Sequence, residues 1–222
     1  AKTLYVQLMD GFGQMTETRS ASITINPPRK AVVSIGWAYD DVAPGCVFDS
    51  GLGINRMNYS ATARTFVWDS GEDAGTVVKG DSVNFNEDIR VGGATTGDDS
   101  GMYPDSVLEK YVRYNGFPQN TYGHRTASIH LSPGTYRLRL FCSLNSTYKN
   151  STEFMKVQTV VDGVANVFEL PDGYDVIGNL TRWLEQEITV PESGMFELQW
   201  GMENATKGWM EVPLNIIEIE ET

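Results

Sequence analysis

Apolar and polar side chains alternate along much of this chain, and the alternation is most regular between residues 126 and 143. In the second half of this stretch the even positions are apolar, whereas Arg137 and Arg139 occupy odd positions. A period of two is typical of a strand with one buried face and one wetter face. A similar run comes before it, and the intervening Ser132-Pro133-Gly134 is typical of a turn. We therefore predict a central β-hairpin here, covered on one face by a second sheet.

Shorter alternating runs predict further strands along the chain. They cover residues 31–35, 55–60, 65–68, 76–79, 153–161, 165–169, 181–190, 195–200 and 212–220. Residues 107–114 fit either a strand or a single helical turn. No apolar run follows the helical period over a dozen residues, so little helix is expected. The runs on either side of 162–163 and of 191–194 are expected to pair. The pattern predicts an all-β fold, a two-sheet antiparallel jelly-roll-like β-sandwich.

Residues 1–28 differ in pattern from the rest of the chain. Two alternating runs, 3–9 and 20–25, flank an Asp-Gly-Phe-Gly turn, and Asn26-Pro27-Pro28 then forms a stiff break. A hairpin on its own is marginally stable in water. We interpret 1–28 as the end of a preceding module and 29–222 as the main domain. The alternative is an extra edge hairpin packed on the sandwich.

Four stretches together carry a resemblance to a known family. The 126–143 run is followed by Phe154–Gly163, which ends in an Asp-Gly turn, then by Gly194–Trp200 and by Pro213–Glu220. Their order and spacing resemble malectin-like and galactose-binding-like β-sandwich domains, over roughly residues 30–221. Residues 1–28 resemble the last two strands of bacterial immunoglobulin-like or fibronectin-like repeats. The resemblance implies carbohydrate binding by a domain appended to a secreted, polysaccharide-degrading bacterial protein.

Charge and hydropathy narrow the choice of partner. The formal net charge is −12, which excludes nucleic acid as a ligand because phosphates require a cationic surface. It also disfavours strongly anionic polysaccharides, so a neutral glycan is expected. Arg113 and Arg125 flank an aromatic-rich segment and are the groups that would favour an anionic sugar. No apolar run approaches the roughly 20 residues of a membrane-spanning helix, and we expect an extracellular or cell-surface location.

Aromatic residues in predicted loops are the candidate ligand-binding groups. Sugar rings stack their flat C–H faces on aromatic rings, and their hydroxyls need polar partners nearby. The alternative is that these rings close the open end of the sandwich. The candidates are Trp37, Tyr39, Asp40, Tyr103, Tyr114, Phe117, Tyr122, His124, Arg125 and Trp209.

Catalytic and metal-binding signals are weak. The sequence contains no Gly-x-Ser-x-Gly elbow, no His-Glu-x-x-His and no phosphate-binding loop, so we do not expect an enzyme. A glycosidase carboxylate pair, which can come from any part of a chain, stays open. Sandwiches of the resembling family often hold a structural calcium ion. The acid clusters Asp40-Asp41 and Asp98-Asp99 and the strand residue Glu218 are its candidate ligands, with ordinary surface charge as the alternative. No other cofactor is expected.

The two cysteines, Cys46 and Cys142, allow two interpretations. They are either small buried hydrophobic residues or the partners of a disulfide in a secreted protein.

The sequence thus predicts a non-catalytic carbohydrate-binding module within a multi-modular extracellular protein. An adhesion or spacer module is the main alternative, and a small glycoside-active domain is a third.

Overall fold

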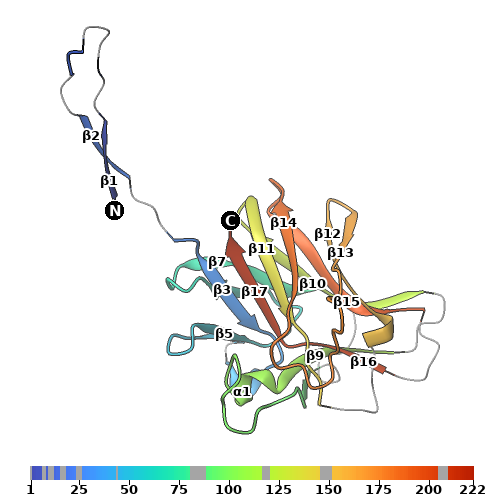
Figure 1. The fold of residues 1–222 in the computed structure, drawn as a ribbon. Coiled ribbons are helices and arrows are strands. Elements are labelled where there is room, and N and C mark those ends of the chain that lie inside the picture. Colours follow the sequence, from blue (N-terminus) through green and yellow to red (C-terminus); the bar gives the residue numbers. More distant parts are fainter. Residues whose placement is uncertain are drawn as a thin grey trace.

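The computed structural model describes residues 2–6, 9, 13–15, 19–23, 27–43, 45–80, 89–116, 121–145, 152–204 and 210–222. Two six-stranded sheets pack face to face, and short helical turns lie outside them (Figure 1). The predicted all-β sandwich is confirmed. No helix of the described part of the chain is long and apolar enough to cross a membrane.

The first sheet, which we call the β10 sheet, has the strand order β13-β12-β15-β10-β7-β6. Its strands are β13 (Val164–Val167), β12 (Met155–Val161), β15 (Met195–Glu203), β10 (Tyr122–Leu131), β7 (Asp73–Lys79) and β6 (Arg64–Val67).

The second sheet, the β11 sheet, has the order β14-β11-β17-β3-β5-β4. Its strands are β14 (Leu184–Val190), β11 (Gly134–Phe141), β17 (Ile216–Glu221), β3 (Lys30–Ser34), β5 (Ile54–Met57) and β4 (Cys46–Asp49). Its β3 and β5 pair in parallel, with Val33 opposite Asn55, which departs from the predicted antiparallel order. The chain runs through a 3-10 turn η1 (Tyr39–Asp41) and β4 before β5, and this crossover permits the parallel pairing.

The predicted hairpin over 126–143 is wrong in its pairing. Strand β10 pairs with β15 and β7, whereas β11 pairs with β14 and β17, so the turn at 132–133 carries the chain from one sheet to the other. The predicted pairing of 181–190 with 195–200 is wrong for the same reason, because β14 and β15 lie in different sheets. Alternation shows which face of a strand is buried, and both members of each pair bury one face in the shared core. The pairing of β12 with β13 is confirmed.

The core fills the space between the two sheets. Phe66, Ile129, Leu138 and Phe196 are fully buried there, and the ring of Trp200 lies 5.6 Å from that of Tyr59 in an edge-to-face contact. Cys142 is buried and Cys46 is half-buried, and both are free thiols. The structure therefore favours the interpretation of the cysteines as small hydrophobic residues.

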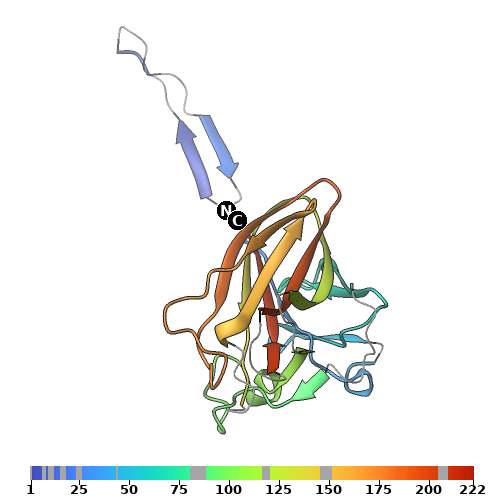
Figure 2. The ribbon, with the colours of Figure 1, turned by 90° about the vertical axis from the view of Figure 1, so that its right-hand side faces the viewer.

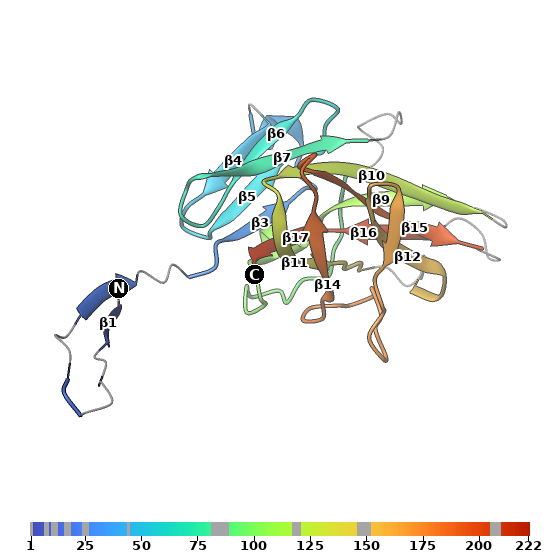
Figure 3. The same ribbon diagram turned by 90° about the horizontal axis from the view of Figure 1, so that it is seen from above.

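A third sheet closes one end of the core. It has the order β16-β9-β8, with β16 (Met210–Leu214), β9 (Lys110–Gly116) and β8 (Ile89–Val91), and β9 and β16 lie beside β10 and β15 (Figure 3). Val112, Val212 and Leu214 join the main core from this sheet.

Residues 107–114 contain both the predicted helical turn and the predicted strand, since helix α1 (Asp105–Leu108) is followed at once by β9. The sequence analysis assigned no strand to 89–91.

The segment around α1 covers the outer face of the β11 sheet. Val107 and Leu108 pack there with Val32, Phe141 and Ile216 in a second, smaller core. Asn215, in the break between β16 and β17, fixes this segment: its side-chain carbonyl accepts the Ser143 N–H at 2.7 Å, and its amide donates to the Leu108 carbonyl at 2.8 Å.

Strands β1 (Lys2–Val6) and β2 (Arg19–Ile23) form a sheet of their own. They lie away from the sandwich, joined to it through residues 27–29 (Figure 1). The assignment of 1–28 to a preceding module stays a prediction. A further short helical turn, η4 (Thr152–Phe154), leads into β12.

Candidate functional site

The candidate site lies on the outer face of the β10 sheet, where β10 begins. Odd positions of β10 such as Ala127 and Ile129 are buried in the core, so Tyr122 and His124 point to the opposite face. In the neighbouring strands, Glu203 is opposite Tyr122, and Gly201 lies between His124 and Lys156. Residues directly opposite each other share a face, so three strands bring Tyr122, His124, Lys156 and Glu203 together.

Contacts within this group hold the ring of Tyr122 in one place. The Tyr122 and His124 rings stack with centroids 4.5 Å apart and planes at 17°. The ammonium nitrogen of Lys156 lies 4.9 Å from the Tyr122 ring centroid and 2.9 Å from a carboxylate oxygen of Glu203. The Tyr122 hydroxyl donates to the Lys156 carbonyl at 3.2 Å. The ring is therefore positioned before any ligand arrives, which lowers the entropy lost on binding.

The same contacts define the electrostatics of the site. Burial, with the nearby Glu203 carboxylate, raises the pKa of Tyr122, so the phenol keeps its proton at neutral pH. The Lys156 and Glu203 side chains are 24% and 44% exposed, so their ion pair reaches solvent. These four side chains place charged hydrogen-bonding groups beside two aromatic rings. The Lys156–Glu203 pair has no net charge.

Side-chain amides extend this surface along the sheet. The Gln158 amide donates to the Gln199 carbonyl oxygen at 2.7 Å, and the Gln199 amide donates to Glu197 at 3.0 Å. Gln158 and Gln199 are directly opposite each other on β12 and β15. A line of oriented donors and acceptors therefore continues from Lys156 toward the centre of the sheet.

A glycine forms the floor between His124 and Lys156. A Cβ atom at Gly201 would lie 1.9 Å from the Gly123 carbonyl oxygen, so this position has to remain glycine for β10 and β15 to approach each other. The site therefore has bare backbone between the two side chains.

Two predicted residues lie behind this face. Arg125 points from the inner face of β10, is 8% exposed, and donates from Nε to the Arg113 carbonyl at 3.3 Å. Its guanidinium carbon lies 5.9 Å from the Tyr114 ring centroid. Arg113 forms an ion pair with the buried Glu211. The two arginines proposed as anion-binding groups are thus engaged within the protein.

Trp37 and Tyr103 lie in connecting segments that pack on the outer face of the β11 sheet, separate from Tyr122. Trp37 is 7% exposed, its N–H donates to the Ser34 hydroxyl at 2.9 Å, and the Arg56 guanidinium carbon lies 5.1 Å from its ring centroid. A ring buried in this way has no free face for a sugar. Tyr103 is half-buried, with its ring 6.3 Å from that of Trp183 in an edge-to-face contact.

The predicted site residues therefore do not form one cluster. Tyr122 and His124 share the outer face of the β10 sheet, Tyr114 and Arg125 lie inside it, and Trp37 and Tyr103 pack on the β11 sheet. Phe117, Trp209 and the side chain of Tyr39 lie outside the described residues.

The candidate calcium ligands are also separate. Asp40 and Asp41 are exposed in η1. Glu218 is 2% exposed and accepts from Arg139 at 2.6 Å, Lys30 at 3.4 Å and the Tyr103 hydroxyl at 3.3 Å. Its charge is therefore balanced by side-chain cations of the protein itself.

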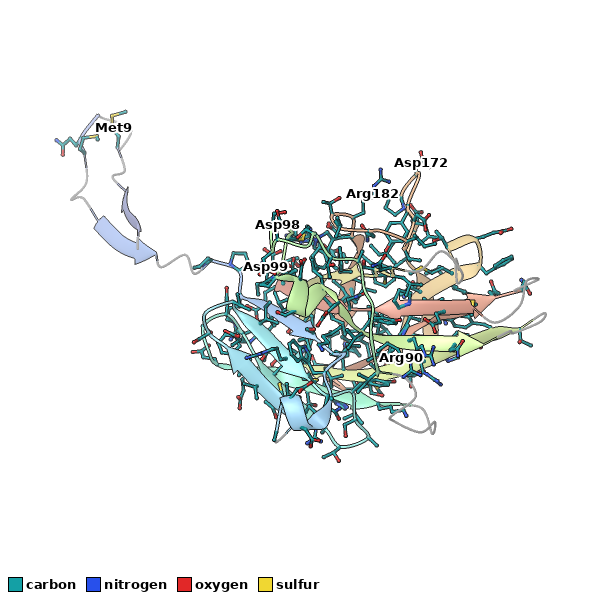
Figure 4. All side chains as sticks on the ribbon, turned by 90° about the horizontal axis from the view of Figure 1, so that it is seen from below. Met9, Arg90, Asp98, Asp99, Asp172 and Arg182 are labelled. Carbon is teal, nitrogen blue, oxygen red and sulfur yellow. The ribbon has the colours of Figure 1, made fainter. Side chains whose placement is uncertain are left out.

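The second acid cluster orders its own loop. Asp98 and Asp99 lie on the loop before α1 (Figure 4) and accept the backbone N–H groups of Ser100 and Asp105. Hydrogen bonds, chiefly from Ser100, lower the pKa of Asp98. Within the described ranges no group of three or more His, Cys, Asp or Glu side chains gathers to hold a metal ion.

The sequence analysis did not identify Lys156, Gln158, Gln199 and Glu203 as site residues. A signal was present, because Lys156 and Gln158 alternate with buried Met155 and Val157 and so had to face outward. Their proximity to Tyr122 follows from the strand order β12-β15-β10, which local alternation does not specify.

Comparisons with known proteins give only distant similarities. No protein-family model matches the chain, and no curated protein matches it. Among solved structures, the chain is similar to a chain of the complex of the plant peptide RALF23 with FER and LLG2, at 15% identity and a TM-score of 0.44, over 87% of this chain and 48% of that one. It is also similar to the ANXUR1 extracellular domain from Arabidopsis thaliana, at 15% identity and a TM-score of 0.43, over 98% of this chain and 53% of that one.

A third similar structure is a family 35 carbohydrate binding module from an environmental isolate. The identity is 15% and the TM-score 0.32, over 64% of this chain and 90% of that one. The chain spans about half the length of the two plant chains. Similarities at this level transfer no residue role, so the function has to be argued from the site.

Proposed function

We propose that this chain is a non-catalytic carbohydrate-binding module and that the outer face of the β10 sheet around Tyr122 holds the sugar. The observation that carries the proposal is the stacked Tyr122–His124 pair, fixed beside Lys156 and Glu203 on a polar sheet face. Tyr122 and His124 are half-buried, and the exposed part of this ring pair can contact the C–H groups of a sugar. The neighbouring carboxylate, ammonium and amide groups can bind its hydroxyls.

The expected affinity is weak, of order 10–1000 μM, because an open sheet face removes little ligand surface from water. The pre-positioned rings partly offset this, since few side chains must be ordered on binding. A weak site is sufficient for a domain that anchors linked modules to a polymer, because tethering raises their effective concentration. We place the domain in an extracellular, multi-modular protein on this basis.

A neutral glycan is the preferred ligand. The Lys156–Glu203 pair has no net charge, Arg113 is paired with Glu211, and Arg125 is buried beneath the sheet. At about 0.15 M salt the Debye length is about 8 Å, so groups near the site outweigh the overall charge of the chain. Lys156 on this face is already neutralised by Glu203, so it gives a sulfate or a uronate little advantage over a neutral sugar.

The arrangement does not favour glycoside hydrolysis at this face. Glu203 is paired with Lys156, and the nearest described carboxylate that shares its face of β15, Glu197, lies six residues away. Six residues of a strand span about 20 Å, whereas glycosidase carboxyl pairs are about 5–9.5 Å apart.

The test is a screen of the full chain by affinity electrophoresis in gels that contain neutral or anionic polysaccharides, followed by calorimetry with a disaccharide of the retained polymer. Tyr122→Ala is expected to cost about 1–3 kcal/mol of binding, the range for an aromatic anchor. His130→Ala is a matched control for His124→Ala, because His130 is exposed on the same face of β10, about 20 Å farther along. Thermal melts of each variant verify the fold.

Two results would overturn the proposal. One is the absence of retention by any polysaccharide, which would favour an adhesion or spacer module. The other is an equal loss of disaccharide binding in His124→Ala and His130→Ala, because a site around Tyr122 cannot touch both histidines with so short a ligand.

A further inference from the structure

We propose that the ligand is the interior of an extended neutral polysaccharide, which lies along β10 from Tyr122 toward His130. This inference rests on the proposed function and adds the mode of recognition, namely several consecutive sugars of a chain instead of its end.

The outer face of the β10 sheet is polar along the whole length of β10. The outward residues of β10 after His124 are Thr126, Ser128 and His130. On β15, Gln199 is opposite Thr126 and Glu197 is opposite Ser128. Thr126 is buried, so the groups that this strip offers to sugar hydroxyls are the Ser128 hydroxyl, the Gln199 amide, the Glu197 carboxylate and the His130 imidazole.

A second place for a sugar lies at the far end of this strip. A hollow of about 360 Å³ is lined by residues 73–76 and 130–132, and Thr76 is directly opposite His130 within it. The eight residues from Tyr122 to His130 span about 26 Å at the rise of a strand. The ring pair and the hollow are therefore too far apart for a mono- or disaccharide to touch both.

In the part of the chain that the structure describes, no helix or strand crosses the outer face between these two places (Figure 2). Among the described elements, β9 and β16 make the main contacts with β10 and β15 from outside their own sheet. The contact between Tyr114 of β9 and Arg125 shows that β9 lies on the inner side. Figure 2 shows this sheet with β12 in the foreground and no described helix across it. The middle of the strip carries Thr126, which is only 7% exposed, and the half-buried Ser128. Both side chains are small, so a sugar chain would pass over them.

The experiment measures the affinity of oligosaccharides of increasing length, from disaccharide to octasaccharide, prepared by partial hydrolysis of the neutral polysaccharide retained in the gel screen. For the unmodified chain, affinity is expected to rise at least tenfold between the shortest and longest ligands. Tyr122→Ala should weaken binding at every length. His130→Ala should leave the disaccharide unaffected and abolish most of the gain with length. Glu187→Ala, exposed on β14 of the other sheet, is the control and should change nothing.

The outcomes separate the two proposals. If the polymer and the disaccharide both fail to bind, the proposed function itself fails. If the disaccharide binds but length has no effect, or if His130→Ala keeps the full gain with length, only the recognition of a chain interior is refuted. In that case the site around Tyr122 contacts no more than one or two sugar units.

Discussion

Replacing Glu218 by glutamine tests how strongly the outer face of the β11 sheet is held by charge. The Glu218 side chain is 3% exposed and accepts from three donors, of which Arg139 is the closest at 2.6 Å. Glutamine keeps the shape but removes the charge, so the charge-assisted bonds become neutral ones worth about half as much. The Arg139 and Lys30 side chains remain 26% and 42% exposed, and water partly compensates them. We expect a loss of about 2 kcal/mol, below the roughly 3–5 kcal/mol for breaking a fully buried pair.

The assay is urea unfolding, in which the dependence of the unfolding free energy on urea concentration should be unchanged. The melting temperature should fall by about 4–8 °C. Glu220→Gln is the matched control, because Glu220 lies two residues farther along β17 and pairs with Arg137. Those two side chains are 24% and 43% exposed, so this change should cost under about 1 kcal/mol. Equal losses in the two variants, or a loss below about 0.5 kcal/mol in Glu218→Gln, would refute the reasoning.

Three further predictions concern stability. Gly201→Ala should cost about 2–3 kcal/mol in urea unfolding, because the new methyl group meets the Gly123 carbonyl, whereas Gly51→Ala, whose Cβ would meet nothing closer than 3.4 Å, should be nearly neutral. Burial raises the pKa of the Cys142 thiol to about 12. The contribution of the protonated thiol to the free energy of unfolding is therefore complete below its unfolded pKa of about 8.5, and it is lost as the pH rises toward 12. The urea midpoint should therefore fall in alkali, and less steeply in Cys142→Ala. Deleting residues 1–28 should leave the thermal midpoint of the sandwich unchanged, and a loss of cooperativity would show that the β1–β2 hairpin belongs to the core.

The sequence predicted burial well and strand neighbours poorly. Tyr136, Leu138 and Leu140 are buried as their alternation indicated, because a side chain's face follows directly from its position in the strand. The partner of a strand depends on where a turn sends the chain, and the turns at 132–133 and 191–194 both send it to the opposite sheet. Local sequence does not distinguish a turn within a sheet from one between sheets. The parallel pairing of β3 with β5 was unpredictable for the same reason.

The candidate site was predicted only in part. Tyr122 and His124 lie on the polar face, but Trp37 is buried although it lies in a loop. Its ring packs with Val107 and Leu108, more than 60 residues away in the chain, and with Lys110 over its ring. Contacts at that separation leave no trace in the residues around Trp37. Lys156 and Glu203 could be assigned to an outer face from alternation, but their position beside Tyr122 required the order of the strands.

The two outer faces of the sandwich differ in a way that explains where a ligand can bind. The outer face of the β11 sheet carries Val32, Phe141 and Ile216, and it must be covered, which the α1 segment does with Val107 and Leu108. The outer face of β10 carries Thr126, Ser128 and His130 after the ring pair, and of these only Thr126 is buried, so this face has no apolar side chains that require cover. Substitution of His130, which is exposed on this face, removes no buried contact and should not lower stability. On the outer face of the β11 sheet, replacing an apolar side chain would remove contacts with the α1 segment and lower stability. The outer face of the β11 sheet is thus occupied by packing, whereas the outer face of the β10 sheet carries the proposed binding residues.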